Sequence, residues 1–259
     1  MNTMKLEDTL FPVSEVPAVW EDVAPMAPQA NVNTSNHKFI INDKTQQVIS
    51  CMTNDYKLVT NEEVINSAHP ILKEYGATLR EVQVFGNGAR THWKWKFPDT
   101  VTIGEDKLQP EAIIKNSYDG SCQISVLAGV FRLVCMNGLV IGTVYGKFSN
   151  RHIVHNQRLD KLDETIPHLI THVKEMIGVD VPFLQKTKIK ETDIVKLIEL
   201  FPEPIEGLLD YFKSHKMDTY WDLLNAATWF LTHSMNRSRE SVHKLESKVY
   251  PTISSWAAA

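Results

Sequence analysis

Apolar and polar residues alternate over most of the chain between residues 37 and 145, as expected of β-strands with one buried face. The clearest pair is Thr78–Phe85 and Ala89–Phe97, joined by Gly86-Asn87-Gly88, whose residue types suit a tight hairpin turn. The same period predicts further strands at Lys38–Asn42, Gln47–Thr53, Glu111–Lys115, Gln123–Met136 and Leu139–Tyr145. Because short turns join these strands, we expect a curved antiparallel sheet.

A helical period interrupts this pattern once and replaces it after about residue 158. Thr60 and Glu63 have capping-box spacing for a helix over Asn61–Tyr75. Gly76 is placed to end that helix, and Pro70 is expected to kink or split it. Four later helices are predicted at Leu162–Ile177 with Gly178 after it, Thr192–Leu200, Thr219–His233 with Asp218 as its cap, and Arg237–Tyr250. The expected fold class is therefore α+β, with packed helices on the sheet domain and a helical C-terminal region.

Residues 1–36 show neither period. They contain four prolines, and up to residue 35 they carry one lysine against five acidic residues. We expect an extended N-terminal arm here that is mobile when the protein is alone. The predicted organisation is an arm over 1–36, a β-rich α+β domain over 37–158, and a helical region over 159–259 that packs on the sheet.

The composition is that of a globular protein, with 43% apolar residues and a net charge of −4. Bulk charge therefore does not favour a polyanion, and nucleic acid would need a local basic patch. Cys51, Cys122 and Cys135 form no CxxC pair, which favours reduced thiols in a cytosolic protein. The N-terminal residues show no leader pattern, and no apolar run is long enough to span a membrane.

The strand Arg90–Phe97 is the strongest candidate for such a patch. Strand geometry places Trp93, Trp95 and Phe97 on one face, and the basic residues Arg90, His92, Lys94 and Lys96 on the other. The basic residues would lie about 7 Å apart, close to the spacing of phosphates along an extended single strand. The alternative is an ordinary solvated face on an amphipathic hairpin.

Two more basic residues are weaker candidates for nucleic-acid contacts. Lys115 ends a predicted strand, and Arg132 lies between Phe131 and Leu133 in an apolar one. An unpaired guanidinium is too costly to bury, so Arg132 must reach solvent, bind an anion, or pair with an acid such as Asp119.

The residues that enzymes use do not form a recognisable pattern. GxSxG, Walker and dinucleotide-binding motifs are absent, so no cofactor is expected. His168 and His172 have i, i+4 spacing, but no third ligand or adjacent Glu accompanies them, so no metal is expected. The segment Tyr118–Ser121 places an Asp and hydroxyls together, although tight turns select these residues anyway.

Several of these segments together resemble a known family. Asn116–Ser121 (NSYDGS), Phe131–Leu139 (FRLVCMNGL), Arg151-His152 and Trp221–Thr228 (WDLLNAAT) resemble the phage/plasmid-like protein family, domain of unknown function 932. The motif residues carried over are Tyr118, Asp119, Gly120, Ser121 and Asn137. The resemblance implies a mobile-element protein of the bacterial host cytoplasm, in a family with no established enzymatic activity.

These observations favour a binding protein over an enzyme. The leading hypothesis is a phage or mobile-element protein, associated with recombination or replication, that binds or anneals single-stranded DNA as a homo-oligomer. The alternative is a protein- or ligand-binding factor that counters a host defence or modulates a host enzyme, using the acidic arm and the tryptophans Trp221, Trp229 and Trp256.

Overall fold

The computed structural model describes residues 5–18, 36–103, 106–132, 137–141, 148–150, 159, 162–201, 204–237 and 239–259. Antiparallel strands fill the N-terminal half and helices the C-terminal region, which confirms the predicted α+β class. The chain divides into two compact units that interleave along the sequence. Unit 1 comprises 1–95, 113–126 and 148–166, and unit 2 comprises 96–112, 127–147 and 167–259.

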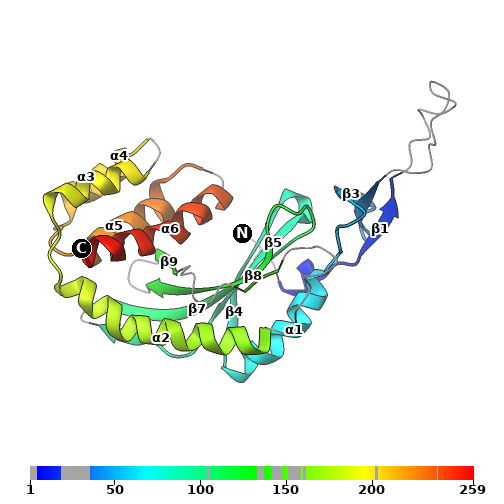
Figure 1. Ribbon diagram of the computed structural model, residues 1–259, viewed down its shortest axis with the longest axis horizontal. Helices are drawn as coiled ribbons and strands as arrows, with labels where there is room; N and C mark the ends of the chain where they lie inside the picture. The colour runs from blue at the N-terminus through cyan, green and yellow to red at the C-terminus, as the bar shows by residue number, and fades with distance from the viewer. Residues whose placement is uncertain are drawn as a thin grey trace. The chain divides into compact units, whose positions relative to one another are not determined.

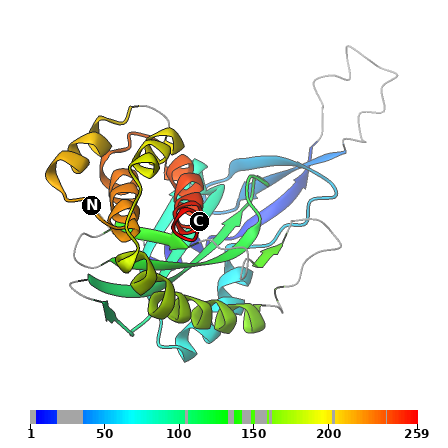
Figure 2. The same ribbon diagram turned by 60° about the vertical axis from the view of Figure 1, so that its left-hand side comes forward.

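A small sheet in unit 1 joins the N-terminal segment to the first hairpin. Its strands are β1 (Val13–Pro17), β2 (His37–Asn42) and β3 (Gln47–Thr53), in the order β1-β2-β3 (Figure 2). β1 pairs antiparallel with β2, with Val13 opposite Asn42 and Pro17 opposite Lys38. Residues 13–17 are extended, as expected of the arm, but they are not left unattached: they form an edge strand whose backbone pairs with β2.

The larger sheet has the strand order β10-β8-β7-β5-β4, with β6 paired to β7 and β9 paired to β8. Its strands are β4 (Thr78–Phe85), β5 (Arg90–Lys96), β6 (Val101–Ile103), β7 (Asp106–Ser117), β8 (Ile124–Arg132), β9 (Asn137–Ile141) and β10 (Phe148–Asn150). The predicted turn η3 (Gly86–Gly88) joins β4 to β5, and all three of its residues have positive φ. Glycine and asparagine tolerate that conformation best, which is why this hairpin was the clearest local signal.

Helix α1 (Asn61–Glu74) follows the small sheet in unit 1 and has the predicted capping box between Thr60 and Glu63. The expected split at Pro70 does not occur, and the helix continues through that residue. Asn66 and Pro70 are both exposed, so water can bond the Asn66 carbonyl whose helical partner the proline ring removes. The buried face of α1 carries Val64, Ile65, Ala68 and Leu72.

Helix α2 (Leu162–Lys186) is nine residues longer than the predicted helix, which ended at Ile177. Gly178 lacks the positive φ of a helix-ending glycine and is helical, with open space where a Cβ would lie. Val181 and Leu184 continue the buried face beyond it, so packing outweighs the local stop signals of Gly178 and Pro182.

The remaining helices of unit 2 are α3 (Glu191–Leu200), α4 (Glu206–Ser214), α5 (Tyr220–Trp229), a π-turn η5 (Phe230–Ser234) and α6 (Arg239–Ala257). Helices α5 and α6 lie beside each other and contact β9 (Figure 1). Thr219, and not the predicted Asp218, caps α5 through a capping box with Asp222. Helix α4 is not among the predicted helices, and α6 extends beyond the predicted end at Tyr250.

Candidate functional site

Two of the four basic residues predicted to form a row on β5 are paired with acidic side chains. Arg90 Nε lies 3.4 Å from Asp119 Oδ2, and Lys94 Nζ lies 3.2 Å from Glu81 Oε2. The side chains of Arg90 and Lys94 are only 22% and 13% exposed. The expectation of an exposed cationic row is therefore wrong. Alternation shows which residues share a face, but it does not show that the face is open to solvent.

The other predicted basic residues do not extend this row into an exposed surface. His92 is 5% exposed, and its ring packs 4.9 Å from the ring of Phe85. Lys96 is half-buried and belongs to unit 2, and Lys115 is half-buried on β7. The orientation of the Arg132 side chain lies outside what the structure describes, although its backbone pairs with Asn137.

The motif turn after β7 forms a structural junction. The Tyr118 hydroxyl accepts a 2.7 Å hydrogen bond from the backbone N–H of Asn61, at the start of α1. Burial raises the pKa of Tyr118 above its ordinary value, so the hydroxyl stays protonated. Asn116 donates from Nδ2 to the Val59 carbonyl and to Asn61 Oδ1. These buried bonds fix the first turn of α1 against the end of β7.

The rest of the motif makes turn contacts. Asp119 Oδ1 accepts a hydrogen bond of 2.9 Å from the Ser121 backbone N–H, while the second carboxylate oxygen pairs with Arg90. Gly120 has φ +68°, and a Cβ there would lie 2.9 Å from the methyl of Met52. Tyr118, Asp119, Gly120 and Ser121 therefore have clear structural roles. The motif segments around Cys135 and Arg151-His152 lie outside the described residues.

The same junction holds the N-terminal segment in place. Thr9 is fully buried, and its hydroxyl accepts a 3.0 Å hydrogen bond from the indole N–H of Trp93. The Thr9 carbonyl accepts a second bond, from Asn61 Nδ2. Phe11 packs edge-on to Tyr118 and leaves no room for a side chain at Gly88. No local signal in the sequence predicts this, because Trp93 is 84 positions from Thr9.

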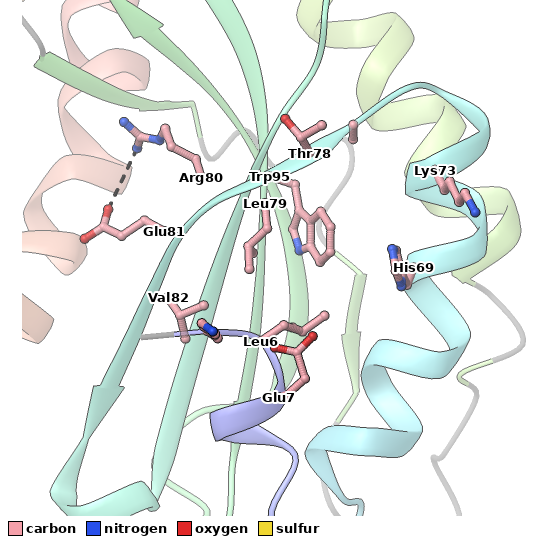
Figure 3. A pocket seen from close by; sticks show the side chains of 12 residues that line it. Leu6, Glu7, His69, Lys73, Thr78, Leu79, Arg80, Glu81, Val82 and Trp95 are labelled. Atoms are coloured by element: carbon pink, nitrogen blue, oxygen red, sulfur yellow. Dashed lines mark ion pairs between the residues drawn. The ribbon is translucent and has the colours of Figure 1, made fainter. Parts of the chain in front are cut away.

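A pocket of about 680 Å³ opens in unit 1 between α1, β4 and the N-terminal segment (Figure 3). Its lining is mainly apolar, with Leu6, Leu79, Val82 and Trp95 among the contributing residues. The charged side chains around it are Lys5, Glu7, Lys73, Arg80 and Glu81, and His69 projects from α1. Apolar walls with a few polar groups, at this size, are typical of small-molecule sites.

Trp95 provides an unsatisfied donor beside this pocket. It is 2% exposed, and its indole N–H is buried with no hydrogen-bond partner among the described residues. The indole ring lies 5.2 Å from the His69 ring, at an angle of 36°. Most buried polar groups in proteins are hydrogen-bonded. A buried donor without a protein partner next to a cavity can therefore donate a hydrogen bond to an acceptor atom of a ligand.

Two of the charged groups at the pocket form part of one ion-pair network. Glu81 lies 3.2 Å from Lys94 Nζ and 4.0 Å from Arg80. Burial raises the pKa of Glu81, but attraction to Lys94 and a hydrogen bond from Gln83 outweigh it, so the net pKa lies below the ordinary value. Glu81 is thus an anion already balanced by protein cations.

Unit 2 carries a row of four contacting aromatic rings, which we call the ring row: His215, Tyr211, Trp229 and His233. His215 stacks on Tyr211 at 3.9 Å and 7°, Tyr211 lies 5.0 Å from Trp229, and Trp229 lies 5.7 Å from His233. Both histidines are exposed. Of the other tryptophans expected on helix surfaces, Trp221 is buried, and Trp256 lies under Lys196.

The described residues thus define an α+β protein with an apolar pocket bordered by charged groups. Within them, no three His, Cys, Asp or Glu side chains cluster as a metal site would need, and no helix is long and apolar enough to cross a membrane. The family model described as "Domain of unknown function (DUF932)" matches residues 48–249, so the chain belongs to this family.

Two curated relatives come from Escherichia coli (strain K12). The UPF0380 protein YfjQ is 29% identical over 103 residues, which are 40% of this chain and 32% of that protein. The UPF0380 protein YafZ is 46% identical over 73 residues, 28% of this chain and 23% of that protein. The matches therefore span less than a third of either relative. No solved structure matches the chain.

Proposed function

We propose that this protein is a non-enzymatic binding protein whose ligand occupies the pocket of unit 1. The observation that carries the proposal is the cavity of about 680 Å³ beside the Trp95 N–H, which has no partner in the part of the chain that the structure describes. Three separate segments, 5–7, 69–82 and Trp95, contribute its lining. Apart from the buried Trp95 N–H and the ion-pair network of Glu81, the polar side chains of the lining are exposed and dispersed. This arrangement suits recognition better than acid–base chemistry.

A fluorine NMR screen of small ring compounds, including neutral, anionic and cationic ones, tests this function. Thr78 is exposed and lines the pocket, so Thr78→Trp fills the cavity without entering the core. Thr102→Trp is the matched control, an exposed strand threonine in unit 2. We expect compounds that bind the wild type and Thr102→Trp but not Thr78→Trp. The proposal fails if no compound binds, or if every compound that binds the wild type binds Thr78→Trp equally well.

Single-stranded DNA binding is a second candidate, and the ring row is the observation that favours it. Bases stack on exposed aromatic side chains without regard to sequence, whereas Arg90 and Lys94 of β5 are paired with carboxylates. On this proposal the exposed His215 and His233 and the half-buried Trp229 hold bases, while the buried Tyr211 supports them from below. Association into a homo-oligomer would extend the surface. This second candidate includes a role in recombination. It also includes phage or host proteins as partners of the DNA-bound form.

Quenching of tryptophan fluorescence by an oligothymidylate tests this second candidate. Trp229→Leu is expected to weaken binding by about 1–3 kcal/mol, the usual cost of losing one stacked base. Lys94→Gln with Lys96→Gln is expected to leave affinity nearly unchanged, because these side chains are half-buried. If Trp229→Leu leaves the affinity unchanged and the double lysine change weakens it, the DNA-binding surface is on β5 and not on the ring row.

A further inference from the structure

We infer that the pocket of unit 1 takes a small anionic ligand with a flat apolar body, such as an aromatic carboxylate. This inference rests on the proposed function and names the ligand class for the same pocket. Three features of the lining support it: a donor without a partner, cations that outnumber the free anions, and two ring faces beside an apolar wall.

The donor is the Trp95 indole N–H. It can only donate, so the ligand atom that satisfies it must be an acceptor. The nitrogen has almost no exposed surface, and Figure 3 shows it on the side of the ring that faces Leu79 and Leu6. The inference requires the side chains that cover this nitrogen to move aside when the ligand enters. Hydrogen bonds to ionised acceptors are the stronger ones in such a site.

The charge around the pocket favours a negative ligand. Lys5 and Lys73 are exposed, and within the described residues neither side chain is paired with a carboxylate. Of the two carboxylates among the described lining residues, Glu81 is balanced by Lys94 and Arg80. The remaining carboxylate, Glu7, faces two cations, Lys5 and Lys73. A carboxylate entering near Lys73 therefore meets net attraction.

The shape and chemistry of the walls favour a flat body. His69 and Trp95 present rings 5.2 Å apart and inclined by 36°, and His69 is exposed at the pocket rim. Leu6, Leu79 and Val82 supply aliphatic contacts from the other elements. An aromatic ring can pack against these faces with offset or edge-on geometry, while its charged group points to Trp95 or Lys73.

The test uses three probes with one ring system: 2-naphthoate, 2-naphthamide and 2-naphthylmethylammonium. Each is titrated into the full chain with ¹⁵N-labelled tryptophan at pH 7.5, and the Trp95 indole N–H signal is followed. We expect 2-naphthoate to bind about tenfold more tightly than the neutral amide, and the cation to bind least, as charge-assisted bonds predict. The Trp95 N–H proton is expected to shift downfield with the anion.

Two variants separate the donor from the charge. β-(3-Benzothienyl)alanine at position 95 keeps the shape of tryptophan but replaces the N–H with sulfur, and it is expected to abolish the preference for the anion over the amide. Lys73→Gln is expected to weaken 2-naphthoate about fivefold, as loss of one charged contact does, and to leave the amide unchanged. Lys44→Gln, in the exposed turn between β2 and β3, is the charge control and is expected to change neither.

The outcomes distinguish this inference from the proposed function. If the amide or the ammonium probe binds as tightly as 2-naphthoate, and Thr78→Trp removes that binding, the pocket binds ligands but the anionic class is wrong. If none of the probes binds and the fluorine screen is also empty, both proposals fall. An unchanged anion preference without the Trp95 N–H would remove that donor from the site.

Discussion

The indole N–H of Trp93 on β5 donates a hydrogen bond of 3.0 Å to the hydroxyl of Thr9, in the N-terminal segment. Both residues are fully buried, and the Thr9 hydroxyl also donates to the carbonyl of Leu6. One side chain therefore connects the segment that borders the pocket with strand β5 of the larger sheet. The bond relates the stability of the fold to the shape of the candidate site.

Thr9→Val tests this connection. Valine has nearly the same shape but cannot accept from Trp93, so the indole N–H becomes a second buried donor without a partner. We expect a loss of about 1–3 kcal/mol in the free energy of unfolding, measured by urea denaturation. Thr53→Val, at an exposed position of β3, is the matched control and is expected to change stability by less than about 0.5 kcal/mol. Equal effects of the two changes would contradict the role given to Thr9.

Gly207 and Gly178 predict opposite responses to alanine. A Cβ at Gly207 on α4 would overlap the Ser234 hydroxyl and lie 2.6 Å from the Ser234 Cβ. Gly207→Ala is thus expected to lower the melting temperature, and Ser234→Gly to restore part of the loss. Gly178→Ala meets open space within a helix and is expected to stabilise by about 0.5–1 kcal/mol. Calorimetry measures the melting temperatures of the three variants. A higher melting temperature for Gly207→Ala would contradict the close contact between Gly207 and Ser234.

Asp193 gives α3 an acid-sensitive contact. The carboxylate is buried and accepts from Lys196 at 2.7 Å and from the Tyr220 hydroxyl at 2.5 Å. Burial alone would raise the pKa of Asp193, but these hydrogen bonds lower the pKa by more than burial raises it. The folded pKa therefore lies below the ordinary 3.8. A depressed folded pKa contributes stability that is complete above the unfolded pKa and is lost as the pH falls toward the folded one.

Asp193→Asn is therefore expected to be less stable than the wild type at pH 7 and to lose less stability as the pH is lowered below about 4. Denaturation curves at several pH values measure the difference. Asp210→Asn, at a 71% exposed ion pair, is the control and is expected to follow the wild-type pH profile. Parallel profiles for wild type and Asp193→Asn would show that the carboxylate has no shifted pKa.

The pair of Lys94 and Glu81 is expected to have a measurable coupling energy. Its side chains are 13% and 34% exposed, so solvent screens the pair only in part. A double-mutant cycle of Lys94→Met and Glu81→Gln is expected to give about 0.5–1 kcal/mol of favourable interaction. A coupling energy of zero would mean that Glu81 does not hold Lys94, which would support the predicted contacts between the basic residues of β5 and phosphates.

Local chemistry made part of the fold predictable. The hairpin at Gly86–Gly88 needs positive φ in three consecutive residues, and the capping box of Thr60 needs only a Glu three positions later. The family resemblance of the Asn116–Ser121 turn was also readable from consecutive residues, and the family model confirms it. Such signals lie within a few positions of one another in the chain.

The candidate site was not predictable in this way. Its lining combines Leu6, His69 and Trp95, which are adjacent only after the chain has folded. The basic row failed for a related reason, because the partners of Arg90 and Lys94 come from other parts of the chain: Asp119 from the turn after β7, and Glu81 from β4. Likewise, the stop signals at Gly178 predicted a helix end that the buried residues beyond it override.

Lys5, Leu6 and Glu7 line one side of the pocket just before the anchored Thr9. A purification tag or fusion attached before Met1 thus lies only a few positions from a segment that shapes the ligand site. Affinities measured with a tag at that end can differ from those measured with a tag after Ala259. Ligand affinities can be compared for the protein with a tag at either end and after cleavage of the N-terminal tag. The difference would measure how strongly residues 5–7 contribute to ligand binding.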